Sequence, residues 1–357
     1  MADFIPGLEG VVAFETEIAE PDKEGSALRY RGVDIEELVG HTPYEQVWGL
    51  LVDGTLDPGL PEMPGIQLPL RTGSIAADMQ AGVASLSGSL SLGAFYDIDE
   101  AQARADLARV STAAISFAAQ SARGDATPVD EATVAQGNTL AERFLLRWRG
   151  ELDKAQAQAI DAYWVSAAEH GLNASTFAAR VISSTGADAA AAVSGAIGAL
   201  SGPLHGGAPT RVMTMIEEVE RSGDPEGYVK NVLDSGGRLM GFGHRVYRAE
   251  DPRARVLRRT ALELGTPRYE VAEALEKAAL AELRARKPDR VLETNVDFWA
   301  SLVLDFAEIP SQLFTPLFAC ARTAGWSAHC LEQKRLGKLV RPAARYVGPS
   351  ARALSSL

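Results

Sequence analysis

The stretch GPLHGGA, residues 202–208, places one histidine, His205, in a turn that has almost no other side chains. Upstream, residues 188–200 are nearly all small and helix-compatible, and a helical pattern resumes at 210–213. His205 therefore lies at a predicted corner between two helices. Glycines at such a corner allow a backbone and a ligand to approach each other closely.

Two more corners of this kind follow, GFGHR at 241–245 and NVDF at 295–298, and they carry His244 and Asp297. A single histidine in a glycine-rich turn is often only a helix cap or a surface residue. Three corners, each with a titratable side chain in a break between helices, favour one assembled site. We therefore expect His205, His244 and Asp297 to lie together.

Length and composition narrow the class of protein. A chain of 357 residues exceeds the usual size of one hydrophobic core, so a large domain with a smaller one is expected. The net charge of −12 argues against a nucleic-acid partner. The two cysteines, Cys320 and Cys330, lie in one helical stretch without metal-ligand spacing, which indicates reduced structural thiols and no metal site.

No targeting or membrane segment is visible in the sequence. Residues 1–7 lack a basic region followed by an apolar core, so no signal peptide is expected. The longest small-apolar run, 187–200, is shorter than the roughly 20 residues that a membrane-spanning helix needs. A cytoplasmic protein without a membrane partner is the expectation.

The periodicity of apolar residues predicts an overwhelmingly helical chain with a short N-terminal β-hairpin. The hairpin is expected from residues 11–14 and 28–31 around a turn at 21–26, and a proline-rich loop is expected at 55–70. The small-residue helix at 187–200 should be central or buried, and the one at 310–336 reads as amphipathic. Helical patterns cover 43–53, 74–88, 100–122, 129–149, 155–170, 187–200, 213–219, 225–233, 267–287, 298–306 and 310–336.

Two local patterns suggest binding residues. Asp251-Pro252 is a strong helix start, so Arg253 falls in the first turn, where a cation opposes the helix dipole unless an anion is near. The alternative is a solvated basic face shared with neighbouring arginines. His170, at a predicted helix end, is typical of a favourable charge–dipole contact, but the nearby Asn173 makes a binding role more attractive.

These motifs, taken in order, closely resemble those of the citrate synthase family. The resemblance covers almost the whole chain, and the segment 241–253 is its most specific part. The matching segments are 29–35 (RYRGVDI), 170–175 (HGLNAS), 202–208 (GPLHGGA), 241–253 (GFGHRVYRAEDPR), 295–298 (NVDF) and 325–342.

The resemblance implies a fold, an activity and a partner. The fold is an all-α citrate-synthase-like one, with a large domain at 1–206 and 309–357 and a smaller domain inserted at 207–308. The activity is the condensation of an acyl-CoA thioester with oxaloacetate, with acetyl-CoA as co-substrate and no permanently bound cofactor. The partner is a second copy of the chain in a homodimer whose sites each borrow residues from the other subunit.

The resemblance also implies roles for single residues. Asp297 would remove a proton from the acetyl methyl group, His205 would donate a hydrogen bond to the thioester oxygen, and His244 would polarise the oxaloacetate ketone. The positions matching substrate-binding residues are His170, Asn173, Arg253, Arg322 and, from the other subunit, Arg341. The positions matching contacts to coenzyme A are Leu204, Gly241, Phe242, Arg248 and Asn295.

The chemistry agrees with these residue types. A carboxylate is a weak base for a carbon acid, so Asp297 needs simultaneous stabilisation of the developing enolate oxygen. We expect His205 to be kept neutral by the positive end of the helix after Ala208 and to act through its N–H. Arginine forks match the two carboxylates of oxaloacetate. Closure of the domains around the substrates should expel water.

Several departures and alternatives stay open. Thr294, Trp299 and Ala343 stand where many relatives have proline, tyrosine and arginine. Because Trp299 follows Asp297 closely, it could alter the acyl pocket, so 2-methylcitrate synthase acting on propionyl-CoA is the nearest alternative. A non-catalytic, metabolite-binding relative is disfavoured because the proposed base is retained. The chain lacks the extra N-terminal domain of larger bacterial members, which favours a simple dimer.

Overall fold

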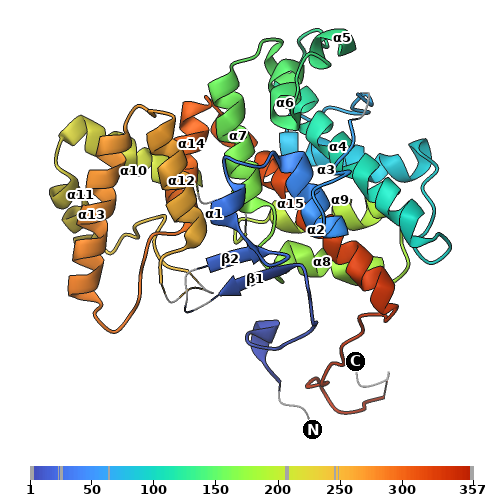
Figure 1. Cartoon of the computed structure of the whole chain (residues 1–357). Coiled ribbons are helices and arrows are strands. Elements are labelled where there is room, and N and C mark those ends of the chain that lie inside the picture. The colour runs from blue at the N-terminus through green and yellow to red at the C-terminus, as the bar shows by residue number, and fades with distance from the viewer. Residues whose placement is uncertain are drawn as a thin grey trace.

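The computed structural model describes residues 4–22, 24, 27–62, 65–205, 209–244, 247 and 249–353, apart from the side chains of Pro209 and Thr210. Helices dominate it, and a small antiparallel sheet lies near the N-terminus (Figure 1). The predicted all-α fold class is therefore confirmed. Among these residues, no helix is both long enough and apolar enough to cross a membrane.

The N-terminal sheet differs from the predicted hairpin in its first strand and in having a third strand. It follows a 3-10 turn at Pro6–Leu8 and has the strands β1 (Ala19–Asp22), β2 (Ala27–Tyr30) and β3 (Val33–Asp34) in the order β1-β2-β3. β1 pairs with β2 in the register Ala19↔Tyr30. The prediction of a strand at 11–14 was wrong, because these side chains bury little surface and Val12 is 85% exposed.

The first group of helices runs from the sheet to the middle of the chain. Its members are α1 (Ile35–Leu38), α2 (Tyr44–Asp53), α3 (Ile75–Ser89), α4 (Glu100–Arg123), α5 (Glu131–Val134), α6 (Leu140–Arg149), α7 (Lys154–Ala167), α8 (Ala174–Ser184) and α9 (Ala189–Leu200). The predicted single helix at 129–149 is two helices, because Thr139 caps a new one through the N–H of Glu142. The helix predicted at 155–170 ends at Ala167, which leaves His170 in a connection.

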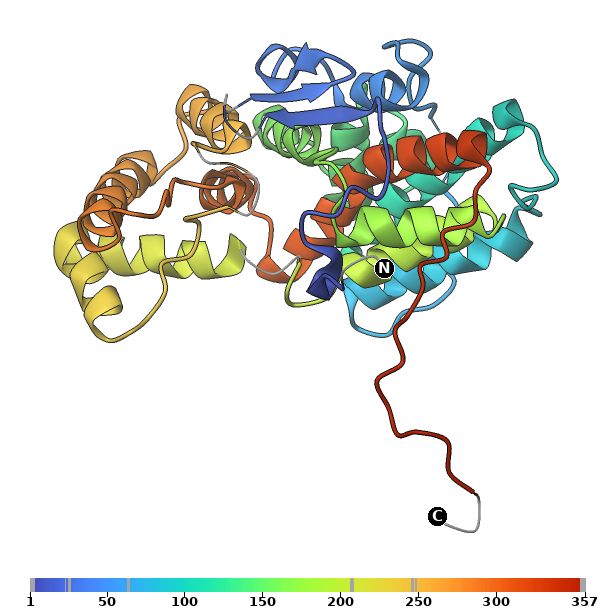
Figure 2. The same cartoon turned by 90° about the horizontal axis from the view of Figure 1, so that it is seen from below.

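The long C-terminal helix α15 (Phe314–Leu336) follows a 3-10 turn at Ser311–Leu313 and passes through the centre of the molecule (Figures 1 and 2). The prediction of an amphipathic helix was wrong, because α15 packs against α2, α4, α7, α8 and α9 and is buried on all sides over most of its length. The small-residue helix α9 is mostly buried, as predicted, and packs closely on α3 and α8.

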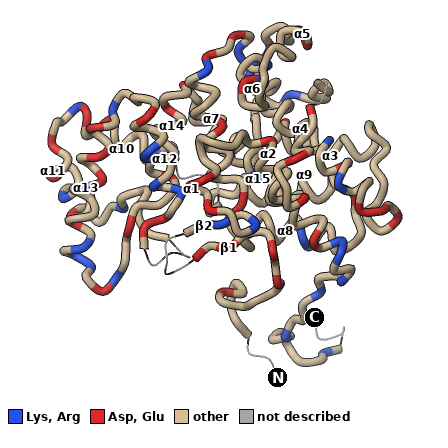
Figure 3. Tube along the Cα trace, viewed as in Figure 1, with Lys and Arg blue, Asp and Glu red and all other residues tan. Residues whose placement is uncertain are grey.

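The remaining helices form a second group, which lies on the left in Figures 1 and 2. They are α10 (Pro209–Ser222), α11 (Pro225–Asp234), α12 (Pro252–Glu263), α13 (Tyr269–Arg286) and α14 (Val296–Phe306). Charged residues are dense along this group, whereas the middle of the molecule has few (Figure 3). α12 and α14 also pack on α7, so they join the two groups. The boundaries of the inserted domain stay a prediction.

Candidate active site

The corner that carries His170 is held by the central helix. The Nε of Arg322 donates to the carbonyl of Ala167 at 2.9 Å, and the N–H of Gly325 donates to the carbonyl of Ala168 at 3.2 Å. These bonds satisfy carbonyls at the end of α7 that no longer have helical partners. His170 is thereby fixed beside α15.

The start of α8 is a second anchored point, and it faces His205. Asn173 caps α8 by accepting from the N–H groups of Ser175 and Thr176, both at 3.1 Å. The hydroxyl of Ser175 accepts from the indole N–H of Trp326 at 3.3 Å. Asn173, predicted to bind substrate, therefore has a structural task as a cap.

His205 points its Nε2 at this helix start. The hydroxyl of Ser175 lies 3.0 Å from Nε2, the Oδ1 of Asn173 lies 3.3 Å away, and the backbone N–H of Ser175 lies 3.4 Å away. Burial, and then the charge of Arg322, lower the pKa of His205, so the ring is neutral at pH 7. Nε2 faces the start of α8. The predicted influence of the helix after Ala208 stays a prediction, because residues 206–208 lie outside the described residues.

The second and third corners are joined to each other. Phe242 and Thr294 form an isolated antiparallel bridge, and the N–H of Asn295 donates to the carbonyl of Gly241 at 2.9 Å. Gly241 has φ +85°, and a Cβ there would lie 2.9 Å from the side chain of Phe298. Only glycine therefore allows the two corners to meet this closely.

Asp251 ties both corners to α12. This fully buried carboxylate caps α12 through the N–H of Arg253 at 3.0 Å and binds the Arg253 side chain through Nε at 3.0 Å and Nη2 at 2.7 Å. It also accepts from the N–H of Val296, the residue before Asp297, at 3.1 Å. The carboxylate that the sequence pattern required near Arg253 is thus present in the protein itself, and Arg253 is not on a solvated face.

His244 lies in a cluster with Tyr247 and His170. Its Nε2 is 3.1 Å from Nη2 of Arg253, and the ring centroids of His170 and His244 are 5.2 Å apart. The hydroxyl of Tyr247 is 3.0 Å from Nε2 of His170. Burial, and then the charge of Arg253, lower the pKa of His244 to about 4. Burial and the surrounding cations hold the pKa of His170 far below its usual range. Both rings are therefore neutral at pH 7.

Asp297 lies in the first turn of α14. Asn295 caps this helix by accepting from the N–H of Asp297 at 3.0 Å. Burial raises the pKa of Asp297 to about 6, with the charge of Arg253 opposing the rise and that of Asp251 adding to it. A carboxyl group of this kind is ionised at neutral pH and is a stronger base than an ordinary aspartate.

Arg322 differs from Arg253 in having an open fork. It is 1% exposed, and its Nε is used by Ala167, but its two terminal nitrogens bind no other group of the described chain. Its guanidinium packs on the ring of Phe318 at 4.8 Å. A buried cation with free donors is suited to bind a carboxylate.

The structure thus brings most predicted site residues around two buried arginines. Arg322 acts on the pKa values of His205 and His170, and Arg253 acts on those of His170, His244 and Asp297. Leu204 is fully exposed. Arg341 is exposed in the extended segment after α15, which runs away from the body in Figure 2. Arg248 lies outside the described residues.

The sequence reasoning missed three residues of this region, Glu169, Ser175 and Tyr247. Glu169 precedes His170 directly, and Tyr247 lies three residues after His244, so proximity to a predicted site residue was the available signal. Their roles depend on distant partners such as His329, at 3.2 Å from Glu169. Local sequence does not reveal such partners.

Comparison with known proteins decides the family. The family profile described as "Citrate synthase, C-terminal domain" matches residues 7–343. The chain belongs to the citrate synthase family. It is 61% identical to "Putative citrate synthase 2" of Mycobacterium tuberculosis over 99% of this chain and 96% of that one. It is also 32% identical to a 2-methylcitrate synthase of Shewanella oneidensis, over 97% of this chain and 95% of that one.

Solved structures of citrate synthases resemble this one over their whole length. The Thermoplasma acidophilum citrate synthase, in a ternary complex with carboxymethyl coenzyme A and oxaloacetate, has a TM-score of 0.80 and 26% identity, over 99% of this chain and 98% of that one. The family consists of enzymes that catalyse a condensation. The predicted family is therefore confirmed, whereas the acyl substrate is not decided by these similarities.

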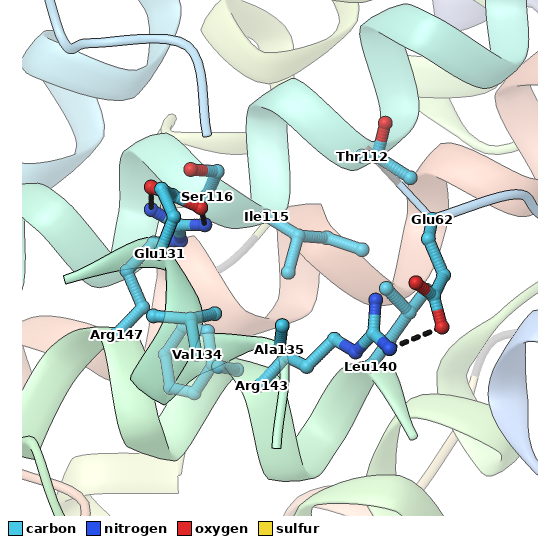
Figure 4. Close-up of a pocket in the computed structure, with 11 residues that line it drawn as sticks. Glu62, Thr112, Ile115, Ser116, Glu131, Val134, Ala135, Leu140, Arg143 and Arg147 are labelled. Carbon is cyan, nitrogen blue, oxygen red and sulfur yellow. Dashed lines mark hydrogen bonds and ion pairs between the residues drawn. The ribbon is translucent and has the colours of Figure 1, made fainter. Parts of the chain in front are cut away.

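A separate cavity of about 360 Å³ lies between α4, α5 and α6 (Figure 4). Its two arginines are paired, Arg147 with Glu131 at 2.6 and 2.8 Å and Arg143 with Glu62. No member of the three corners lines it, so it is distinct from the candidate active site. Its lining residues are Glu62, Thr112, Ile115, Ser116, Glu131, Val134, Ala135, Leu140, Arg143, Phe144 and Arg147.

Proposed function

We propose that the protein is a citrate synthase that condenses acetyl-CoA with oxaloacetate and water to give citrate and CoA. The observation that carries this proposal is the opposite shift of pKa values in one region. The pKa of Asp297 is raised to about 6, whereas those of His205 and His244 are lowered. Pairs of groups whose pKa values are driven apart are typical of acid–base catalysis.

Oxaloacetate is proposed to bind first between the two arginines. The open fork of Arg322 supports a bidentate contact to one carboxylate. Arg253, held by Asp251, supplies a second positive charge, and the neutral ring of His170 adds a hydrogen-bonding group. Arg341 of the partner subunit is proposed to complete the site, which is why we expect a homodimer.

The condensation follows from the charges of the three catalytic groups. Asp297 takes a proton from the acetyl methyl group while the neutral His205 donates its N–H to the thioester oxygen, which stabilises the enolate. The enolate carbon then forms a bond to the ketone carbon of oxaloacetate. The electron pair of the C=O bond moves to the oxygen, which is polarised by His244 and takes up a proton to give the hydroxyl group of the citryl thioester. Water hydrolyses the resulting citryl thioester and releases the CoA thiol.

Coenzyme A is proposed to contact residues of all three corners and the segment after the second. Leu204, Gly241, Phe242, Arg248 and Asn295 are the proposed contacts, and the full exposure of Leu204 supports its access to a ligand. Gly241 and Asn295 also build the corner itself, so their contribution to binding includes a structural part. A cytoplasmic location is part of the proposal.

Propionyl-CoA is the second candidate substrate, because one relative is a 2-methylcitrate synthase. Trp299 does not select between the acyl groups by direct contact. It is fully buried, donates its indole N–H to Glu276 at 2.9 Å and packs on Tyr269 of α13. Positions 297 and 299 lie on different faces of α14, so this indole points away from Asp297.

The test is a thiol-release assay with purified protein, oxaloacetate and either acetyl-CoA or propionyl-CoA. We expect release that depends on oxaloacetate, with a higher kcat/KM for acetyl-CoA. Asp297→Asn should abolish most of it, whereas the matched control Asp305→Asn, on the same helix and paired with Arg268 at 3.0 Å, should retain it. Absence of oxaloacetate-dependent release would overturn the proposal, and a preference for propionyl-CoA would favour the second candidate.

A further inference from the structure

A buried carboxylate beside His170 has no part in the mechanism above. Glu169 is fully buried in the connection after α7. Its Oε1 lies 3.2 Å from Nε2 of His329, and its Oε2 has no hydrogen-bond partner among the described residues. A buried carboxylate oxygen without a partner costs free energy, so a compensating gain is expected elsewhere.

The negative charge of Glu169 is not neutralised by its histidine partner. Nη1 of Arg180 is 2.8 Å from Nδ1 of His329, and arginine can only donate. Nδ1 is therefore an acceptor, and the ring hydrogen is on Nε2, facing Glu169. Arg180 is itself paired with Glu332 at 2.5 Å, so its charge is already balanced there.

Glu169 lies directly against the part of α15 that carries Arg322. Positions 322, 325 and 329 share one face of α15, because residues three and four apart are neighbours on a helix. A Cβ at Gly325 would lie 1.9 Å from Oε2 of Glu169, so glycine is required for the carboxylate to lie there. The carboxylate thus sits between the His329 and Arg322 levels of the helix.

The negative charge of Glu169 stabilises Arg322 without occupying its hydrogen-bond donors. Burial lowers the pKa of Arg322, and the charge of Glu169 is the largest influence that opposes this. The two side chains do not form an ion pair within 4 Å, although both belong to the described part of the chain. The arginine is stabilised at a distance, and its fork stays free.

We propose that Glu169 is a charge-balancing residue that holds the positive Arg322 in the buried site and limits how tightly that site binds a dicarboxylate. This inference rests on the proposed function, because it assumes that Arg322 binds oxaloacetate. Glu169 acts through Arg322 and does not touch the substrate.

Loss of the Glu169 charge should strengthen the binding of a dianion. Removing the charge of Glu169 leaves Arg322 less compensated, so the unliganded protein loses stability and a dianion binds more tightly. One charge acting over roughly 10–12 Å in a medium of effective dielectric about 20 changes a binding constant by roughly tenfold. Turnover should not rise in parallel, because citrate carries one more negative charge and leaves more slowly.

The experiment is oxaloacetate binding by calorimetry on the intact protein, with kcat and KM measured beside it. Glu169→Gln is expected to lower the Kd and the KM for oxaloacetate by about tenfold, and Glu169→Asp, which keeps the charge, should stay near the wild type. The matched control Glu332→Gln changes a carboxylate of the same cluster beyond Arg180 and should leave the Kd unchanged. An unchanged or weaker affinity in Glu169→Gln would overturn the inference alone, whereas no binding of oxaloacetate to the wild type would remove the proposed function as well.

A second measurement covers the case in which Glu169→Gln folds poorly. If the two charges compensate each other, Arg322→Gln should also destabilise the protein, and the double variant should be more stable than the sum of the single effects implies. Thermal unfolding of the four proteins measures this coupling. Restored folding in the double variant supports the inference, and additive losses contradict it.

Discussion

Replacement of Asp251 by asparagine tests how the two corners of the site are tied together. The carboxylate receives the side chain of Arg253 through two bonds, the N–H of Arg253, and the N–H of Val296. Asparagine has one carbonyl oxygen and one NH₂ group. The NH₂ group would replace one of the two carboxylate oxygens and would face an N–H donor of Arg253 or Val296.

The expected loss can be worked out from these contacts. Removing one partner of a buried ion pair typically costs about 3–5 kcal/mol. The helix cap itself is kept, because asparagine caps helices about as well as aspartate. We therefore expect Asp251→Asn to lower the free energy of unfolding by about 3 kcal/mol, and to lower kcat/KM because Arg253 and the start of α14 are no longer fixed.

Asp251→Asn should also change how the stability of the protein depends on pH. Burial raises the pKa of Asp251, but the charge and hydrogen bonds of Arg253 outweigh it, so the pKa is lowered overall. A lowered folded-state pKa contributes stability that is present above the unfolded value of about 4 and lost as the pH falls through the folded value. This loss in acid should be absent from the variant.

The assay is urea unfolding followed by tryptophan fluorescence, with Asp34→Asn as the matched control. Asp34 caps α1 through the N–H of Glu36 at 3.0 Å and has no ion pair within 4 Å among the described residues. The control should lose less than about 1 kcal/mol. The reasoning is refuted if Asp251→Asn costs no more than the control at an unchanged slope in urea.

Three further predictions concern other groups. The kcat/KM for acetyl-CoA should rise with pH through about 6, the pKa of Asp297, and Asp297→Asn should lower it by about 10²–10⁴, as pH–rate profiles of both proteins will show. Burial raises the pKa of Asp161 to about 7, so the stability that its neutral form contributes is present below the unfolded pKa of about 4 and lost as the pH rises through 7. The Asp161→Asn variant lacks this loss. Between pH 4 and 8 its free energy of unfolding, measured from urea midpoints, should therefore rise by on the order of 2 kcal/mol relative to that of the wild type. Gly325→Ala should lower the melting temperature, because its Cβ would lie 1.9 Å from a buried carboxylate oxygen and 2.7 Å from the carbonyl of the preceding helix end, whereas Gly88→Ala, in α3 with no atom within 4 Å, should raise it slightly.

Some elements could be predicted because their signals are local. The capping aspartates and the proline at the start of α12, and the helical periodicity of α2, α3, α4, α9 and α14, depend only on neighbours in the chain. The order of the motifs was enough to indicate the family. The three corners around His205, His244 and Asp297 were visible because glycine and asparagine interrupt helical patterns there.

Other properties required the tertiary structure, because they depend on residues that are distant in the chain. The strand that pairs with β2 is 19–22, the segment just before the turn that leads into β2. The alternation of apolar and polar residues at 11–14 therefore gave a wrong prediction of the first strand. The burial of α15 on all sides depends on the helices that surround it, and the pattern of its own residues does not disclose them. The open fork of Arg322, the paired state of Arg253 and the buried charge of Glu169 likewise arise only where α7, α12 and α15 meet. Sequence alone determined which residues can carry the chemistry, and packing decided which of them are charged, free or occupied, because burial and opposing charges act through space.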